Sequence, residues 1–162
     1  GSHSLTIAKH PSETDERMMV RIIAFALQAH EDLTFTKGLS ETDEPDLWRK
    51  DLTDAISLWI EIGQPDERRI LKACGRSDQV VVYCYGGQTS KIWWDGIANK
   101  LNRARNLQVI SIPAEQAKEL NRLVERSMVL HVNIQDGEAY VSSDLGHVDA
   151  STYFFTRDFS PT

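Results

Sequence analysis

The middle of the chain constrains the fold most, because apolar runs alternate there with segments of helical periodicity. Residues 55–62, 80–85 and 107–112 are nearly continuously apolar and rich in β-branched side chains, as buried strands are. Residues 64–74 and 89–103, which separate them, have the spacing of amphipathic helices. Strands joined through helices run parallel, with the helices on the sheet faces, so a parallel β-α-β-α-β core is predicted.

Shorter elements are predicted on both sides of this core. An opening helix, capped by Ser12 and Asp15 in a Ser-x-x-Asp pattern, should run to about residue 29. Asp136-Gly137 is a strong hairpin turn. The remaining expectations are strands at 33–36, 47–50 and 151–155, a turn at 37–38, a short helix opened by Pro113, and hairpin strands at 128–135 and 138–142. The predicted fold class is therefore α/β (α+β), with a mixed β-sheet and flanking helices.

Two of the predicted helices carry further local signals. Pro65 suits the first position of the helix at 64–74, and Gly75 suits its end. Trp93 begins an i, i+4, i+8 pattern in the next helix and is assigned to the core, whereas this pattern does not explain Trp94.

Length and charge limit the classes of protein that this chain can belong to. Its 162 residues suggest one domain, expected over residues 4–162, because Gly1-Ser2-His3 resembles the remnant of a tag. The net charge of −6 argues against a general electrostatic grip on nucleic acid but leaves room for a local basic patch. Two cysteines are too few for a disulfide framework or a zinc cage, and buried free thiols fit a reducing cytoplasm. No signal peptide or membrane span is expected.

Three groups of acidic residues are candidates for a functional site. Glu13 and Glu16 share a face of the opening helix, although acids there also complement the helix dipole. A second group is Glu41, Asp43, Glu44 and Asp46, which is either a solvated acidic loop or a set of carboxylates for a hard cation. Glu61 stands alone at the carboxyl end of a strand, where ligands bind in open α/β sheets, or where the strand simply reaches water.

The second and third groups are predicted to converge. Pro45-Asp46 precedes one short strand and Glu61 ends the next, so a hairpin between them would bring Asp46 and Glu61 side by side. Two carboxylates placed there could hold a metal ion that positions and activates water against a phosphodiester.

Several segments, in order along nearly the whole chain, resemble those of the YaeQ family of small bacterial proteins: HPSETDERMM, FTKGL, DEPDLW, LWIEIGQPDERRILKAC, IWW and IQDG. That family resembles the PD-(D/E)XK nucleases in fold, which implies a nuclease-like core and Mg²⁺-dependent hydrolysis of DNA or RNA. A family member would carry one more strand before Ser4, and none is expected here.

Residue by residue, the resemblance implies a set of site residues. The metal ligands would be Asp43, Glu44, Asp46 and Glu61, and the helical carboxylate would be Glu16 rather than Glu13. The lysine of the nuclease motif should stand at position 63, which is Gly63.

Two residues could compensate for the missing lysine. Lys72, about two turns into the next helix, could supply the amine, although it could equally be a surface lysine. Gln64 could face the site or cap the helix. The alternative function is a regulatory module that binds nucleic acid or a protein partner and has a degenerate nuclease site.

Overall fold

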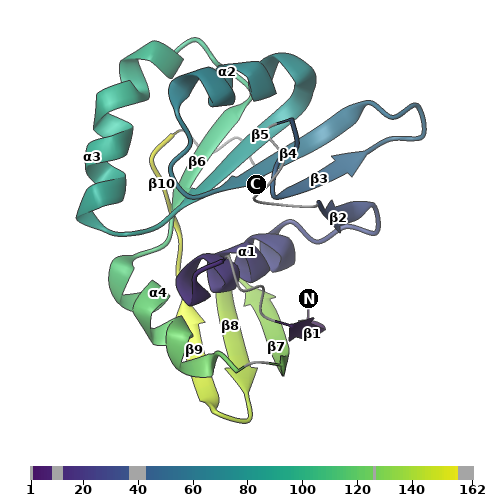
Figure 1. The fold of residues 1–162 in the computed structure, drawn as a ribbon, viewed down its shortest axis with the longest axis vertical. Helices are drawn as coiled ribbons and strands as arrows, with labels where there is room; N and C mark the ends of the chain where they lie inside the picture. The colour runs from purple at the N-terminus through teal and green to yellow at the C-terminus, as the bar shows by residue number, and fades with distance from the viewer. Residues whose placement is uncertain (1, 9–12, 37–42, 126, 157–162) are drawn as a thin grey trace.

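The computed structural model describes residues 2–8, 13–36, 43–125 and 127–156, and within them the chain forms two β-sheets and four α-helices (Figure 1). The strands are β1 Ser2–Ala8, β2 Leu33–Phe35, β3 Leu47–Lys50, β4 Ile56–Ile62, β5 Ser77–Cys84, β6 Leu107–Ser111, β7 Ser127–Gln135, β8 Glu138–Ser143, β9 Gly146–Ala150 and β10 Tyr153–Phe154. The helices are α1 Asp15–Leu27, α2 Glu67–Arg76, α3 Gln88–Ile97 and α4 Ala114–Leu120, and 3-10 turns follow α3 and α4.

The larger sheet is mixed and has the order β10-β6-β5-β4-β3-β2. Strands β4, β5 and β6 are parallel, and the other pairings are antiparallel. The predicted β-α-β-α-β core is thus present, because the crossovers through α2 and α3 leave β4, β5 and β6 running in the same direction.

The expectation of a single mixed sheet was wrong, because the hairpin of β7 and β8 belongs to a separate antiparallel sheet of order β1-β7-β8-β9. Asp136 and Gly137 form its turn with φ of 52° and 79°, as the Asp-Gly signal predicts. Two strands of this sheet, β1 before the opening helix and β9, are not predicted from the sequence. Ser2 and His3, set aside as a tag remnant, pair in β1 with Asn133 and Val132.

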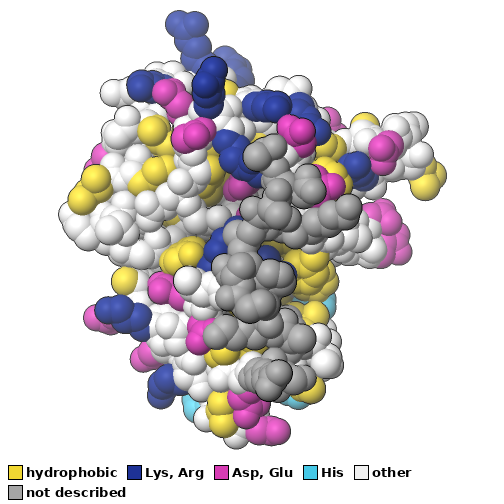
Figure 2. All heavy atoms as spheres, in the orientation of Figure 1, with side chains coloured by type: hydrophobic (Ala, Val, Ile, Leu, Met, Phe, Trp, Pro, Cys, Tyr) yellow, Lys and Arg dark blue, Asp and Glu magenta, His cyan; other side chains and the backbone are white. Residues whose placement is uncertain are grey.

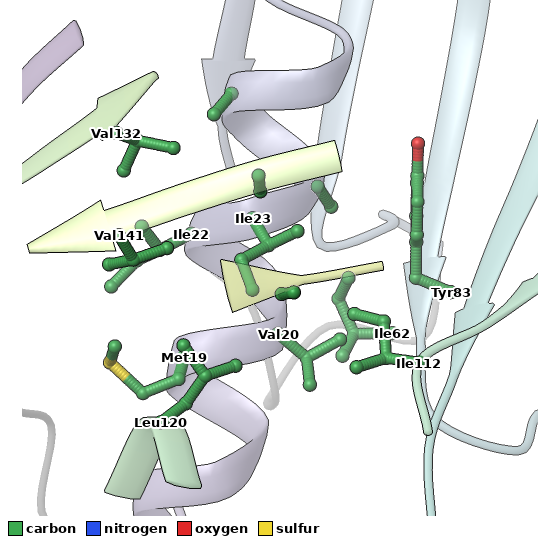
Figure 3. Close-up of a cluster of buried hydrophobic side chains, with 14 of the residues drawn as sticks. Met19, Val20, Ile22, Ile23, Ile62, Tyr83, Ile112, Leu120, Val132 and Val141 are labelled. Carbon is green, nitrogen blue, oxygen red and sulfur yellow. The ribbon is translucent and has the colours of Figure 1, made fainter. Parts of the chain in front are cut away.

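Helix α1 lies between the two sheets, and most of the hydrophobic core surrounds it (Figure 1). Figure 3 shows Ile22 and Ile23 of α1 close to Val132 and Val141 of the smaller sheet, with Ile62 of the larger sheet in the same cluster. Each fully buried aliphatic side chain of this kind contributes about 1.5–3 kcal/mol to folding. Because α1 packs on both sides, it holds the two sheets in one unit.

Helices α2 and α3 cover the opposite face of the larger sheet, where a second apolar cluster forms. Trp94 is buried there and stacks with Phe155, whereas Trp93 is half-buried and donates Nε1–H to the carbonyl of Pro65 at 2.8 Å. Trp93 thus packs against the cluster as its spacing predicts, and Trp94, which the pattern did not explain, is buried more deeply. None of the helices in the described part of the chain has the length and hydropathy of a membrane-spanning segment.

The observed helix ends differ from the predicted ones because other side chains act as caps. Thr14 Oγ1 accepts the Arg17 N–H at 3.1 Å, so α1 starts at Asp15. The predicted cap Ser12 and the predicted turn at 37–38 lie outside the described residues. Asp66 accepts the Arg69 N–H at 2.8 Å, so α2 starts at Glu67, and the helix runs through Gly75.

Both cysteines are free thiols, as predicted. Burial raises the pKa of Cys74 and of Cys84 to about 11, which leaves both thiols protonated and unreactive near neutral pH.

Candidate functional site

Asp46 and Glu61 lie next to each other at the carboxyl end of β4. The antiparallel pairing of β3 with β4 sets Leu47 opposite Ile60, and the Asp46 N–H donates to the Ile60 carbonyl at 3.0 Å. Both acidic residues are only 5% exposed. The predicted hairpin therefore brings the two residues to the same end of β4, and their carboxylates are held by arginines of helices that cover opposite faces of the sheet.

Glu61 faces α2 and is held by two donors. Its Oε1 accepts from Trp59 Nε1 at 2.9 Å and from Arg69 Nε at 2.7 Å. Burial raises the pKa of Glu61, the charge of Arg69 opposes this, and the nearby Asp46 carboxylate adds to it. The carboxylate is thus buried and compensated by an arginine that the sequence analysis did not consider.

Asp46 is held on both of its oxygens. Oδ2 accepts the Ile62 N–H at 2.8 Å, and Oδ1 pairs with Nη2 of Arg17, which reaches it from α1. The same guanidinium donates through Nη1 to Glu13 Oε2 at 2.7 Å, so Arg17 bridges two buried acids. This bridge connects the end of β4 to the helix between the sheets.

The network contains Glu13, which stands just before α1, rather than the predicted Glu16. Glu13 accepts from Arg17 and also from Arg21, whose Nε and Nη2 lie 3.1 and 2.9 Å from its two oxygens. Burial raises the pKa of Glu13, but the two guanidinium groups outweigh it and keep that pKa below its ordinary value. Within the described residues Glu16 adds no hydrogen bond or ion pair to this network.

The acidic loop lies against α2, and the structure places Lys72 there, away from the acid pair. Lys72 Nζ is 3.1 Å from Asp43 Oδ1, and both side chains are largely exposed. The Asp43 and Glu44 carbonyls accept from Arg76 Nη1 at 3.1 Å and from Arg69 Nη2 at 2.7 Å. Of the other loop acids, Glu41 lies outside the described residues, and Oε2 of Glu44 is buried without a hydrogen-bond partner.

Gly63 and Gln64 turn the chain away from the acid pair. Gly63 has φ of +108°, a conformation that favours glycine, and its N–H donates to the Tyr83 carbonyl at 2.9 Å. Gln64 Nε2 donates to the Tyr85 carbonyl at 3.2 Å. Position 63 therefore lies past the end of β4, and a lysine there would have to adopt a strained backbone to continue the nuclease motif.

The carboxylates as arranged do not fit a divalent cation. Mg²⁺ takes oxygen ligands in a near-octahedral shell, which requires carboxylate oxygens that are free to turn toward it. Both oxygens of Asp46 and one of Glu61 are engaged by protein donors. No group of three acidic, histidine or cysteine side chains within the described ranges is placed to hold a metal.

Three arginines that neutralise the buried acids are not among the residues predicted from the sequence: Arg17, Arg21 and Arg69. A signal for two of them was available, since Glu13, Arg17 and Arg21 recur at intervals of four residues, the spacing of charge pairs along a helix. Arg69 carried no comparable signal, because its partner Glu61 is on a strand and the contact depends on how α2 packs.

Comparisons of this chain with known proteins by family profile, by sequence and by structure all find proteins of one family. A profile of the family described as "YaeQ protein" matches residues 1–152. The "Uncharacterized protein YaeQ" of Escherichia coli (strain K12) is 41% identical over 148 residues, covering 91% of this chain and 82% of that protein.

Solved structures agree with the sequence match. The crystal structure of the YaeQ protein from Xanthomonas axonopodis pv. citri superposes with a TM-score of 0.88 at 50% identity, covering 96% of this chain and 88% of that one. The YaeQ protein from Pseudomonas syringae gives a TM-score of 0.86 at 34% identity, with coverage of 95% and 85%. On profile, sequence and structure together, the chain belongs to the YaeQ family.

Proposed function

We propose that this protein is a non-catalytic nucleic-acid-binding module whose site keeps the outline of a PD-(D/E)XK nuclease. The observation that carries the proposal is that Arg17 and Arg69 pair with Asp46 and Glu61, the carboxylates that would otherwise hold a metal ion. Positive charge is thus supplied by fixed guanidinium groups. A guanidinium neutralises a carboxylate but cannot activate a bound water as a metal ion does.

The backbone at Gly63 also supports the absence of catalysis. In the nuclease motif the lysine follows the glutamate by two residues on the same strand, so that both side chains point to one face. Here β4 ends at Ile62 and Gly63 has a positive φ, so this position cannot present an amine beside Glu61. Lys72, the other candidate for that amine, contacts Asp43.

A second candidate function is Mg²⁺-dependent hydrolysis of a phosphodiester. It is favoured by the adjacency of Asp46 and Glu61, and by Glu44 Oε2, a buried carboxylate oxygen that lacks a hydrogen-bond partner. In this case Asp46, Glu61 and Glu44 would hold the ion, and Arg17 would have to leave Asp46. Binding of a protein partner is a third possibility for a site that lost its chemistry.

The test combines metal binding, cleavage and nucleic-acid binding on the same preparations. Wild type and Glu61→Ala are titrated with Mg²⁺ in a calorimeter, incubated with DNA and RNA in Mg²⁺ or Mn²⁺, and titrated against labelled oligonucleotides. The proposal predicts no saturable metal binding at millimolar concentration, no cleavage by either protein, and saturable oligonucleotide binding. Cleavage by wild type that Glu61→Ala abolishes would establish the second candidate, and absence of both cleavage and binding would refute both.

A further inference from the structure

The outer face of α2 is strongly basic in a chain of net charge −6. Arg68, Lys72 and Arg76 recur at intervals of four residues, so they form one exposed stripe along the helix. Figure 2 shows Lys and Arg side chains gathered over the part of the molecule where Figure 1 places α2. Glu67, the one acidic residue of the helix, pairs with Lys100 at 3.2 Å and so does not cancel this stripe.

Cations of this helix converge on one short acidic segment. Lys72 Nζ contacts Asp43 Oδ1 at 3.1 Å, Arg76 Nη1 contacts the Asp43 carbonyl at 3.1 Å, and Arg69 Nη2 contacts the Glu44 carbonyl at 2.7 Å. Each of these contacts is made to a carboxylate oxygen, which is negatively charged, or to a carbonyl oxygen, which carries a partial negative charge. Asp43 and the adjacent carbonyls thus occupy the position that the oxygens of an anionic ligand would take on this helix.

The contact that holds the Asp43 carboxylate is weak by nature. The side chains of Asp43 and Lys72 are 72% and 64% exposed, and ion pairs in water contribute little to stability. Lys72 and, less strongly, Arg76 and Arg69 lower the pKa of Asp43, which places its carboxylate in the field of all three cations. An external anion that meets several of these cations at once would therefore compete well against a single aspartate.

We infer that the phosphodiester backbone of a nucleic acid docks along the outer face of α2 on Arg68, Lys72 and Arg76, and that Asp43 is an intramolecular competitor that this backbone displaces. Successive cations of the stripe are about 6 Å apart along the helix axis, close enough for each to meet a different phosphate of one strand. The inference rests on the proposed function, since it takes nucleic acid as the ligand, and it identifies the surface that binds it.

The test measures fluorescence anisotropy of a short labelled DNA duplex over a series of salt concentrations. Lys72→Ala/Arg76→Ala should weaken binding at least about tenfold at low salt and reduce the slope of log K against log salt by about 1.8. Asp43→Asn, which removes the competing charge and keeps the shape, should tighten binding about threefold. The matched control is Lys118→Ala/Arg122→Ala, which removes two exposed cations from α4 and from the 3-10 turn after it, and should leave affinity and slope unchanged.

The outcomes separate this inference from the proposed function. If wild type binds DNA and Lys72→Ala/Arg76→Ala binds equally well, the inference is overturned while the proposed function stands. If the α4 control weakens binding as much as the α2 variant does, the attraction is general and the α2 site is likewise overturned. An Asp43→Asn affinity equal to wild type refutes the competitor role. The same titration is repeated with a labelled RNA, and if neither wild type nor Asp43→Asn binds DNA or RNA, the inference and the proposed function fail together.

Discussion

Arg17 offers the sharpest test of the buried charge network, because it is the single group that bridges Glu13 and Asp46. Replacing it with methionine keeps the stem of the side chain and removes the guanidinium. Glu13 would retain both contacts from Arg21, at 3.1 and 2.9 Å. Asp46 would retain only the Ile62 N–H at 2.8 Å while its side chain is 6% exposed. The loss of stability in Arg17→Met is therefore determined mainly by the Asp46 carboxylate, which remains buried without a cationic partner.

The expected magnitude follows from this geometry. Removing one partner of a buried ion pair destabilises a protein by about 3–5 kcal/mol, and the remaining backbone donor places Arg17→Met near the lower end, at about 3 kcal/mol. For a domain of this size such a loss lowers Tm by about 6–12 °C. Asp46→Asn alone should lose about 2 kcal/mol, because Arg17 keeps Glu13 and partial contact with water.

The double variant Arg17→Met/Asp46→Asn separates this explanation from a simple packing defect. The double variant has no unpaired charge at position 46, so its free energy of unfolding should fall by about 3 kcal/mol in total. Independent sites would lose about 5 kcal/mol, the sum of the single effects, so the coupling energy between the two sites is about 2 kcal/mol. Urea unfolding followed by tryptophan fluorescence measures all four proteins of the cycle. Arg68→Met on the exposed face of α2 is the control and should change stability by less than about 0.5 kcal/mol. Additive single effects would refute the view that Arg17 neutralises Asp46.

Two further predictions concern the end of β4. Gly63→Ala should destabilise the fold by about 1–3 kcal/mol, because φ of +108° is strained for any residue other than glycine. The cause is the backbone and not crowding, since a Cβ at position 63 meets no atom within 4 Å. The control is Gly75→Ala in α2, where a Cβ also meets no atom within 4 Å and alanine should stabilise the helix by about 0.5–1 kcal/mol. Equal effects in chemical denaturation would show that the Gly63 backbone is not constrained. Because the pKa of Glu61 is raised on folding, ionisation of Glu61 lowers the stability of wild type, so the stability of Glu61→Gln relative to wild type should be highest at neutral pH. This relative stability should fall as pH falls through the raised pKa toward 4.5, and a difference independent of pH would contradict the assigned direction.

Local patterns determined much of this fold, because they depend on residues close in the chain. The apolar runs and the helices between them fix β4, β5 and β6 as parallel neighbours, since a helical crossover leaves few other arrangements. Asp136-Gly137 fixes the β7–β8 hairpin through the positive φ that such a turn requires. The spacing of Asp46 and Glu61 also sufficed to predict the hairpin that places both residues at the end of β4.

The tertiary structure alone decided how many sheets there are. Strands β1 and β9 lie at the two edges of the smaller sheet, and neither sequence, SHSLTIA or GHVDA, contains a continuous apolar run. Their pairing with β7 and β8 depends on contacts between residues far apart in sequence, such as Ser2 with Asn133. Local pattern cannot report such pairings, which is why one mixed sheet was expected.

The charge partners of the site were likewise decided by packing. Glu13 stands just before α1, and Arg17 and Arg21 reach it from positions four and eight residues further along the chain. Arg69 reaches Glu61 only because α2 packs beside β4, and the long guanidinium side chain spans the gap. The sequence by itself thus placed two acidic residues at the end of one hairpin. The tertiary structure determined that arginines neutralise them, because long side chains meet across elements whose relative placement no local pattern encodes.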